Sequence, residues 1–404
     1  MYLRLKFKMT ATYRNSPVDK DLIWQSQASK LLEFLGINID KLFDANDQSN
    51  PLMWLVWIVP IIIFMFYGQR IQLQITSSEI SKSLEKLKTY KEETKKELVE
   101  YIKTTLKPSI DPSPKLDQFF EHFTIMPVDM DPSGIVQKVR HITRSREDYI
   151  RLQVKTLSPD IGGLEASKIE NILEVATTLH LLYKIVRHLF LTAKKQNNFP
   201  LILPLQMMMP FIMEEAEALK TAVSAFKQGQ PIGDGIGPMI VGRMMLGTEK
   251  KTAAFETVWS ESEYEGRKMY LMKAEGPVAT VGRPGDALER IISENKPDII
   301  VMVDAALKLE GEESGSVAQG FGAAIGGIGT ERFQIEEVAT KHKIPIYAIV
   351  IKQSIKEAIT LMKKEIADSA EKVTSQVHEI IKENTKTGQS VLVIGVGNTL
   401  GVSQ

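Results

Sequence analysis

The feature that most restricts the fold is a short apolar run, Pro297 to Ala306, that contains an acid near its end. Residues 299–303 read Ile-Ile-Val-Met-Val, and this length and β-branched content predict a strand buried on both faces. Asp304 then lies at the carboxyl end of the strand, where open α/β sheets collect ligands and chemistry. The alternative is that Asp304 only caps the segment that follows.

The residues around this strand predict an α/β domain over residues 229–404. After Pro231 glycine becomes frequent, and strand-like runs alternate with helical patterns. The expected helices cover residues 236–246, 286–294, 332–341 and 354–385. The expected strands lie near residues 253–260, 267–274, 278–281, 299–303, 344–351 and 390–396. The fold class is therefore α/β, with a parallel or mixed sheet that has helices on both faces.

An uncharged stretch from Pro51 to Gln69 predicts a single transmembrane helix. Its length is at the short end of the roughly 17–25 residues that a spanning helix needs, and its aromatic ends suit the two membrane interfaces. A buried core helix is the alternative, which the charged segment that follows disfavours. More basic residues follow the stretch than precede it. The positive-inside rule therefore predicts a single-pass protein of the cell membrane. Its C-terminal part lies in the cytoplasm, and its short tail, residues 1–50, lies on the outer side of the membrane.

Two helical regions separate this stretch from the α/β domain. Residues 70–107 form a charged stalk with an apolar stripe whose 3.5-residue spacing suits a coiled coil, although Lys91 and Thr94 interrupt the stripe and weaken this interpretation. A homo-oligomer through this stalk is one expected partnership. Residues 108–228 form a helical domain. In it, Met207 to Met209 either fill gaps in a core, the commoner role, or line a soft binding groove.

Charge and composition exclude several classes of function. Acidic and basic residues are equal in number, 50 each, which argues against general binding to nucleic acid. The chain has no cysteine, so it has no disulfide, thiol nucleophile or cysteine-based metal site. We expect no cofactor. A divalent metal ion is the alternative, although nothing in the sequence favours it.

A second acid, Asp234, stands between glycines in Gly233-Asp234-Gly235 and opens a helix. The positive end of the helix dipole favours an acid there, and Pro238 suits the first helical turn. The simplest alternative is a helix cap with no further role.

The last predicted strand ends in a glycine-rich turn, Gly397-Asn398-Thr399. If this strand lies beside residues 299–303, the turn, Asp234 and Asp304 face one crevice. Two carboxyl groups in one crevice raise the pKa of one of them, so that one acts as base on water and the other as acid. This arrangement makes Asp234 and Asp304 the candidate catalytic residues.

A glycine-rich segment, residues 311–330, has no Gly-Lys-Ser/Thr ending and no dinucleotide fingerprint. It predicts either a lid over the crevice or a plain flexible loop. The candidate substrate-binding residues are then Gly233, Gly235, Asn398, Thr399, Gly327 and Gly329.

Two motifs resemble the spore germination endopeptidase and the related hydrogenase maturation endopeptidases: Pro297 to Ala305 and Asp234-Gly235-Ile236-Gly237-Pro238. The resemblance implies a phosphorylase- or hydrolase-like fold in which Asp234 and Asp304 are the two acids of an aspartate-dependent peptidase. In those families the Gly-Asn-Thr strand precedes the acidic motif, so the resemblance implies a circular permutation here. No histidine stands at the metal-binding place, because His342 lies on the next helix. The whole layout also resembles an uncharacterised, membrane-anchored archaeal family.

These observations predict a membrane-anchored, cytoplasm-facing hydrolase, most simply an endopeptidase acting on a protein or peptide through Asp234 and Asp304. One alternative is a non-catalytic scaffold or peptide-binding protein, and another is a metal-dependent hydrolase of small molecules. Carboxylates about 3–5 Å apart, or bridged by one water or metal ion, favour hydrolysis, whereas acids more than about 10 Å apart favour the scaffold.

Overall fold

The computed structural model describes residues 51–108, 111–125, 127, 134–196, 199–327 and 329–403. By internal contacts the chain forms two compact units, residues 1–75 and 76–404. The predicted tail, residues 1–50, lies outside the described residues.

Helix α3 (Pro51–Leu106) includes the segment 51–69 that is predicted to span a membrane. In the part of the chain that is described, no helix has the length and apolar character that a membrane crossing requires. Most side chains of residues 51–71 lie outside that part.

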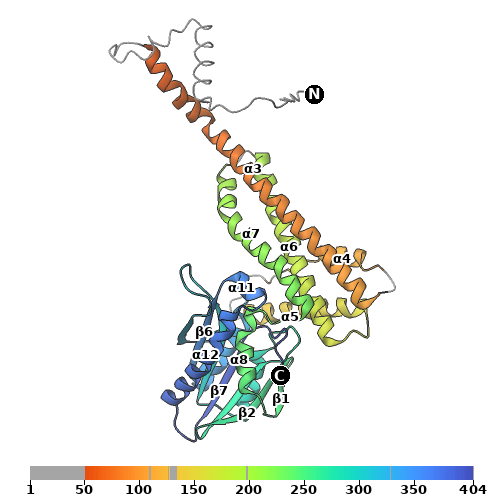
Figure 1. Ribbon diagram of the computed structural model, residues 1–404, viewed down its shortest axis with the longest axis vertical. Helices are drawn as coiled ribbons and strands as arrows, with labels where there is room; N and C mark the ends of the chain where they lie inside the picture. Colours follow the sequence, from red (N-terminus) through yellow and green to blue (C-terminus); the bar gives the residue numbers. More distant parts are fainter. Residues whose placement is uncertain are drawn as a thin grey trace, which may run out of the picture. The chain divides into compact units, whose positions relative to one another are not determined.

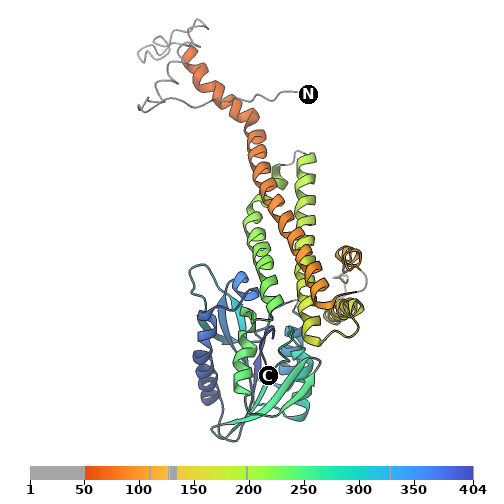
Figure 2. The ribbon, with the colours of Figure 1, turned by 45° about the vertical axis from the view of Figure 1, so that its right-hand side comes forward.

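The second unit begins with a bundle of α3, from Thr76 onward, and two long helices, α6 (Gly163–Gln196) and α7 (Phe199–Gln228) (Figure 1). Figure 2 shows α6 and α7 running side by side. The apolar stripe of α3 is buried within this bundle, at Ile80, Leu87, Leu98 and Ile102. The stripe predicted for a coiled coil between chains is therefore covered by the chain's own helices.

Two shorter helices, α4 (Ser113–Phe120) and α5 (Ile135–Leu157), complete the helical part of the described chain. The α5 helix packs against α6 and against α10 (Thr330–His342) of the α/β domain. It thereby brings the helical part beside the sheet edge where the site lies.

The described residues form one mixed sheet of seven strands in the order β1-β2-β3-β7-β4-β6-β5. Strands β3, β7, β4 and β6 run parallel, and the other pairings are antiparallel. The strand bounds are β1 Lys250–Ala254, β2 Thr257–Tyr264, β3 Arg267–Ala274, β4 Ile299–Leu307, β5 Val317–Phe321, β6 Ile346–Gln353 and β7 Ser390–Gly395. The predicted α/β class with a mixed sheet is confirmed.

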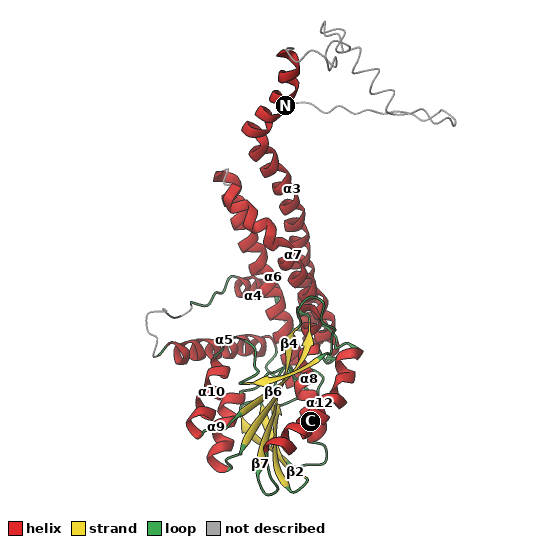
Figure 3. Cartoon of the chain, turned by 90° about the vertical axis from the view of Figure 1, so that its left-hand side faces the viewer, coloured by secondary structure: helices red, strands yellow, loops and turns green. Residues whose placement is uncertain are grey.

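Helices cover both faces of the sheet (Figure 3). One face packs against α8 (Ile236–Met244) and α12 (Lys364–Asn384), and the other against α9 (Pro284–Glu294) and α10. Successive residues of β4 alternate between these two cores: Val301 and Val303 enter the first, and Ile300 and Met302 the second. This alternation explains the continuous apolar run, because both faces of the strand are buried.

Four predictions of local structure were wrong. Residues 278–281 form a loop rather than a strand, and β5 lies inside the predicted glycine-rich loop. The predicted strand 253–260 is a hairpin that turns at Glu256, whose φ is 49°. The predicted helix 354–385 divides into α11 (Ile355–Ile359) and α12, because residue 361 leaves the helix and pairs with Ile232.

Candidate functional site

The last strand, β7, lies beside β4 as predicted. The two strands pair in parallel from Ile299 with Val391 to Val303 with Gly395. The backbone N–H of Val396 donates a 2.9 Å hydrogen bond to the carbonyl of Val303, the residue just before Asp304. Asp304 and the turn that begins at Gly397 therefore lie at the same edge of the sheet.

A close approach of helix α8 to these strand ends brings Asp234 to the same edge. Asp234 belongs to the short helix η1 (Gly233–Gly235), which leads into α8. A Cβ at Gly237 would lie 2.3 Å from the carbonyl oxygen of Val396 and 2.5 Å from that of Val303. Gly397, with a φ of 133°, would place a Cβ 1.9 Å from the carbonyl oxygen of Asp234. Only glycine at these two positions permits the contact.

Asp234 and Asp304 both line one pocket of about 380 Å³. The side chain of Asp304 is almost fully buried, with 6 % of the residue exposed. Its Oδ1 accepts a 2.7 Å hydrogen bond from the backbone N–H of Ala305, and Oδ2 of Asp234 accepts one of 2.7 Å from the N–H of Asn398. The structure thus brings together the two acids that the sequence singles out.

The environment gives the two carboxyl groups different proton affinities. Burial raises the pKa of Asp304 well above its usual value, the charge of Asp234 raises it further, and the hydrogen bond from Ala305 opposes this. Burial also raises the pKa of Asp234, against the hydrogen bond from Asn398. Because the charge of Asp234 raises the pKa of Asp304, these shifts favour a protonated Asp304 together with an ionised Asp234.

Helix α5 supplies a wall of the pocket that the sequence did not predict. Arg140, Thr143, Arg144 and Glu147 line it from α5. Nη2 of Arg144 lies 2.8 Å from Asp286 and 3.3 Å from Glu331, so this guanidinium is neutralised by the α/β domain. The i, i+4 and i+7 spacing of Arg140, Arg144 and Glu147 was the available signal, since it places them on one helix face.

Two arginines of the pocket have no ion pair with any carboxylate in the described part of the chain, namely Arg140 and Arg283. Nε of Arg140 is buried without a hydrogen-bond partner. The guanidinium of Arg283 lies over the ring of Phe255, 4.7 Å from its centroid. Glu147 interacts electrostatically with Arg283, and Asp286 with Arg140, but neither forms a direct ion pair, so both guanidinium groups can still bind an anionic group in the pocket.

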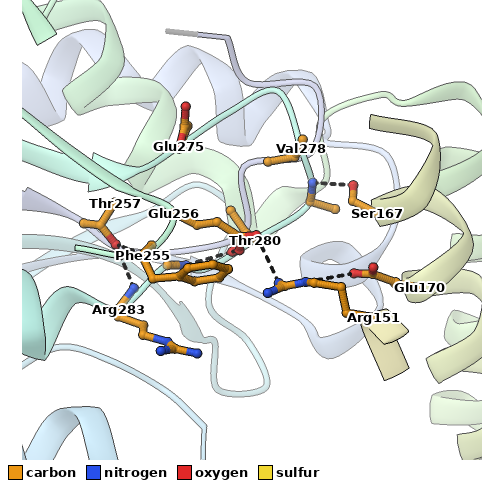
Figure 4. Close-up of polar contacts among 12 residues, drawn as sticks. Arg151, Ser167, Glu170, Phe255, Glu256, Thr257, Glu275, Val278, Thr280 and Arg283 are labelled. Atoms are coloured by element: carbon orange, nitrogen blue, oxygen red, sulfur yellow. Dashed lines mark hydrogen bonds and ion pairs between the residues drawn. The ribbon is translucent and has the colours of Figure 1, made fainter. Parts of the chain in front are cut away.

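The loop that carries Arg283 is held by the helical part of the chain (Figure 4). Arg151 of α5 also lies over the Phe255 ring, 4.8 Å from its centroid, and its Nη2 is 3.0 Å from Glu256. Ser167 of α6 accepts a 2.9 Å hydrogen bond from the backbone N–H of Ala279. The helices thus fix the rim of the pocket.

The predicted substrate-binding residues divide into two groups. Gly327 and Gly329 line the pocket, at the start of α10. Thr399 is fully buried. Its hydroxyl lies 2.8 Å from the carbonyl oxygen of Val278 and 3.0 Å from the carbonyl oxygens of Glu275 and Thr280. It holds the loop that leads to Arg283, and it does not line the pocket.

The other three predicted residues shape the backbone around Asp234. Gly233 donates its N–H to the carbonyl of Thr360 at 3.2 Å, and a Cβ at Gly235 would lie 2.8 Å from the carbonyl of Asn398. The side chain of Asn398 accepts a 2.9 Å hydrogen bond from Leu400 and so forms the turn itself. Among the described residues no group of three or more histidine, aspartate or glutamate side chains is arranged to hold a metal ion.

The models of two domains from one sequence family match the chain. Residues 54–229 match the N-terminal domain of a protein of unknown function, DUF1512, and residues 232–403 match the DUF1512 C-terminal domain. No curated protein matches the sequence. The two matches leave only residues 230 and 231 between them, just before η1. The chain therefore belongs to the DUF1512 family.

Proposed function

We propose that this protein is a hydrolase, and specifically an aspartate-dependent endopeptidase, in which Asp234 and Asp304 activate water. One observation carries the proposal: the two carboxyl groups share a pocket and differ in proton affinity. A pair of acids with one proton between them has both the base and the acid that peptide hydrolysis requires.

The reaction follows from these protonation states. Ionised Asp234 accepts a proton from a water molecule, whose oxygen attacks the peptide carbonyl carbon. Protonated Asp304 donates to the carbonyl oxygen as negative charge develops there. Collapse of the tetrahedral intermediate breaks the C–N bond, and the proton held by Asp234 passes to the leaving amine. Asp304 recovers its proton from the hydroxyl of the intermediate, so both acids return to their starting states.

The arginines of the pocket orient the substrate in this proposal. Arg140 and Arg283 bind a carboxylate of the peptide, either an acidic side chain or the chain end. Arg144 is not assigned this role, because Asp286 and Glu331 already occupy its guanidinium.

The proposal includes a relation to the germination endopeptidases through circular permutation. It is supported by the pairing of β7 with β4 and by the contact of the Asn398 N–H with Asp234. These contacts place the Gly-Asn-Thr turn next to the acidic motif in space although it follows that motif in the sequence.

The proposal also places the protein at the cell membrane, with the α/β domain in the cytoplasm. It is supported by the uncharged stretch 51–69 and by the basic residues that follow it. A peptide substrate is then either membrane-bound or delivered to the membrane.

The decisive experiment incubates the purified full chain with a mixed peptide library and detects new termini by mass spectrometry. Asp234→Asn and Asp304→Asn should each lower cleavage by at least about 100-fold, because each removes one of the two proton-transfer groups. Asp368→Asn, at an exposed acid on α12, is the matched control and should cleave like the wild type. Full cleavage by both pocket variants, with the fold intact by circular dichroism, would show that the acids are not catalytic.

A further inference from the structure

The first half of helix α7 carries an exposed face without a charged residue. Leu203, Met207, Met208 and Phe211 are 38 %, 68 %, 58 % and 73 % exposed. Their spacing places them on one side of the helix, together with the exposed prolines at 204 and 210. The prediction that Met207 to Met209 fill a core holds for Met209 alone, which is 5 % exposed.

The opposite side of the same helical segment packs inside the bundle. Ile202, Leu205 and Met209 are buried there. Residues 197–213 contain no charged side chain, and the first charges on α7 are the exposed Glu214 and Glu215. A helix that is apolar on all sides requires an apolar neighbour on its free face as well. The free face ends where the acids begin.

The adjoining half of helix α6 adds positive charge and no negative charge. Between Glu174 and the end of the helix there is no acid. Its exposed apolar residues are Leu181, Ile185 and Leu191. Its exposed cations without an ion pair among the described residues are Arg187, Lys194 and Lys195, while Lys184 lies 2.6 Å from Glu121. Exposed apolar side chains among lysines and arginines are typical of helices that lie in a membrane interface with anionic lipids.

The position of this surface along α3 agrees with a membrane nearby. Gln206 of α7 accepts a 3.2 Å hydrogen bond from Thr76 and donates one of 2.7 Å to Glu79. Both residues come soon after the uncharged stretch that ends at Gln69. Glu79 is the first acid on α3, so the residues of α3 that precede it carry no negative side chain.

We infer that the α6–α7 surface, made by the exposed residues of 181–196 and 201–213, is a lipid-binding surface that rests in the interface of a membrane with anionic headgroups. The apolar face of α7 enters the boundary between headgroups and acyl chains, and the cations of α6 contact phosphate groups. A second copy of this chain is a poorer occupant, because two such surfaces would bring their cations together. The inference is independent of the proposed hydrolase and does not require residues 51–69 to span.

The absence of cysteine allows a site-specific test on the full chain. Met208→Cys, at an exposed position, is labelled with an environment-sensitive NBD dye. The labelled protein is mixed with vesicles of phosphatidylcholine and phosphatidylglycerol that carry a nitroxide quencher on their acyl chains. We expect a blue shift and quenching of the dye. Lys372→Cys, exposed on α12, is the control and should show neither change.

Two further measurements decide between occupants and test the role of charge. Lys194→Glu with Lys195→Glu, in the Met208→Cys chain, should lower the quenching several-fold, whereas Lys341→Glu on α10 should not. Vesicles of phosphatidylcholine alone should also give less quenching. A dye that stays in water when vesicles are present overturns the inference. A blue shift that grows with protein concentration without lipid also overturns it, and assigns the surface to a second copy of the chain.

Discussion

The backbone N–H of Asn398 donates a 2.7 Å hydrogen bond to the carboxylate of Asp234, although the two residues lie 164 positions apart. The bond favours the ionised form of Asp234 against the burial that raises its pKa. The last turn of the described chain therefore sets the charge of an acid at the start of the α/β domain.

Replacing Asp304 with Asn should stabilise the fold near neutral pH. Burial and the charge of Asp234 raise the folded-state pKa of Asp304 above the unfolded value of about 3.9, so the folded protein binds this proton more tightly than the unfolded chain does. The wild type thus loses stability as the pH rises above about 4, and the variant lacks this loss. Urea unfolding should show the variant more stable than the wild type near pH 7. A difference that does not shrink toward acidic pH contradicts this.

Replacing Arg283 with Gln should weaken substrate binding more than it slows catalysis. The change removes a cation that has no ion pair with a described carboxylate, so a peptide with an acidic residue should show a KM raised by about tenfold and a nearly constant kcat. Arg283→Lys, which keeps the positive charge, should bind the acidic peptide better than Arg283→Gln does. Arg290→Gln, at an exposed arginine on α9, is the control. An equal loss for peptides without an acidic group would instead indicate that Arg283 only supports Phe255.

Replacing Glu170 with Gln should flatten the pH dependence of stability. Burial raises the pKa of Glu170 to about 7, Arg151 opposes the shift, and Glu256 adds to it. Since the folded-state pKa is raised, this glutamate costs stability as the pH rises from about 4.5 to about 7, by at most about 3 kcal/mol. Denaturant midpoints across this range should change less in the variant. Glu174→Gln, one turn along α6, should keep the wild-type profile.

Replacing Gly237 with Ala should destabilise the α/β domain and remove activity together. The new Cβ would overlap the carbonyl oxygens of Val396 and Val303, which forces α8 away from the strand ends and Asp234 away from Asp304. The expected loss is about 3 kcal/mol, the upper end of the range for overpacked sites, because both new contacts are with backbone atoms. Gly320→Ala is the control, because a Cβ at Gly320 would meet no non-adjacent atom within 4 Å, and its effect on stability should be small. Thermal unfolding of both variants measures the difference.

The part of the site built from the sheet was predictable from the sequence. The continuous apolar residues 299–303 indicate a strand buried on both faces, and Asp304 follows it. The pairing of β7 with β4 then brings in Asp234 and the turn at Gly397.

The part built from the helices was not predictable. Helical periodicity shows which face of α5 is apolar but not which domain that face meets, so Arg140 and Arg144 could not be placed. The failed strand at 278–281 has a similar cause. Its carbonyl groups accept from Thr399, a partner 121 positions away from Val278, in place of a neighbouring strand.

The position of β7 between β3 and β4 has a consequence for biosynthesis. A ribosome makes β7 after every other strand of the sheet, so β3 and β4 emerge with open edges and no partner between them. Such edges bind chaperones or pair wrongly if translation pauses. The N–H of Asn398 that contacts Asp234 follows β7 in the chain, so the site is incomplete until β7 is inserted.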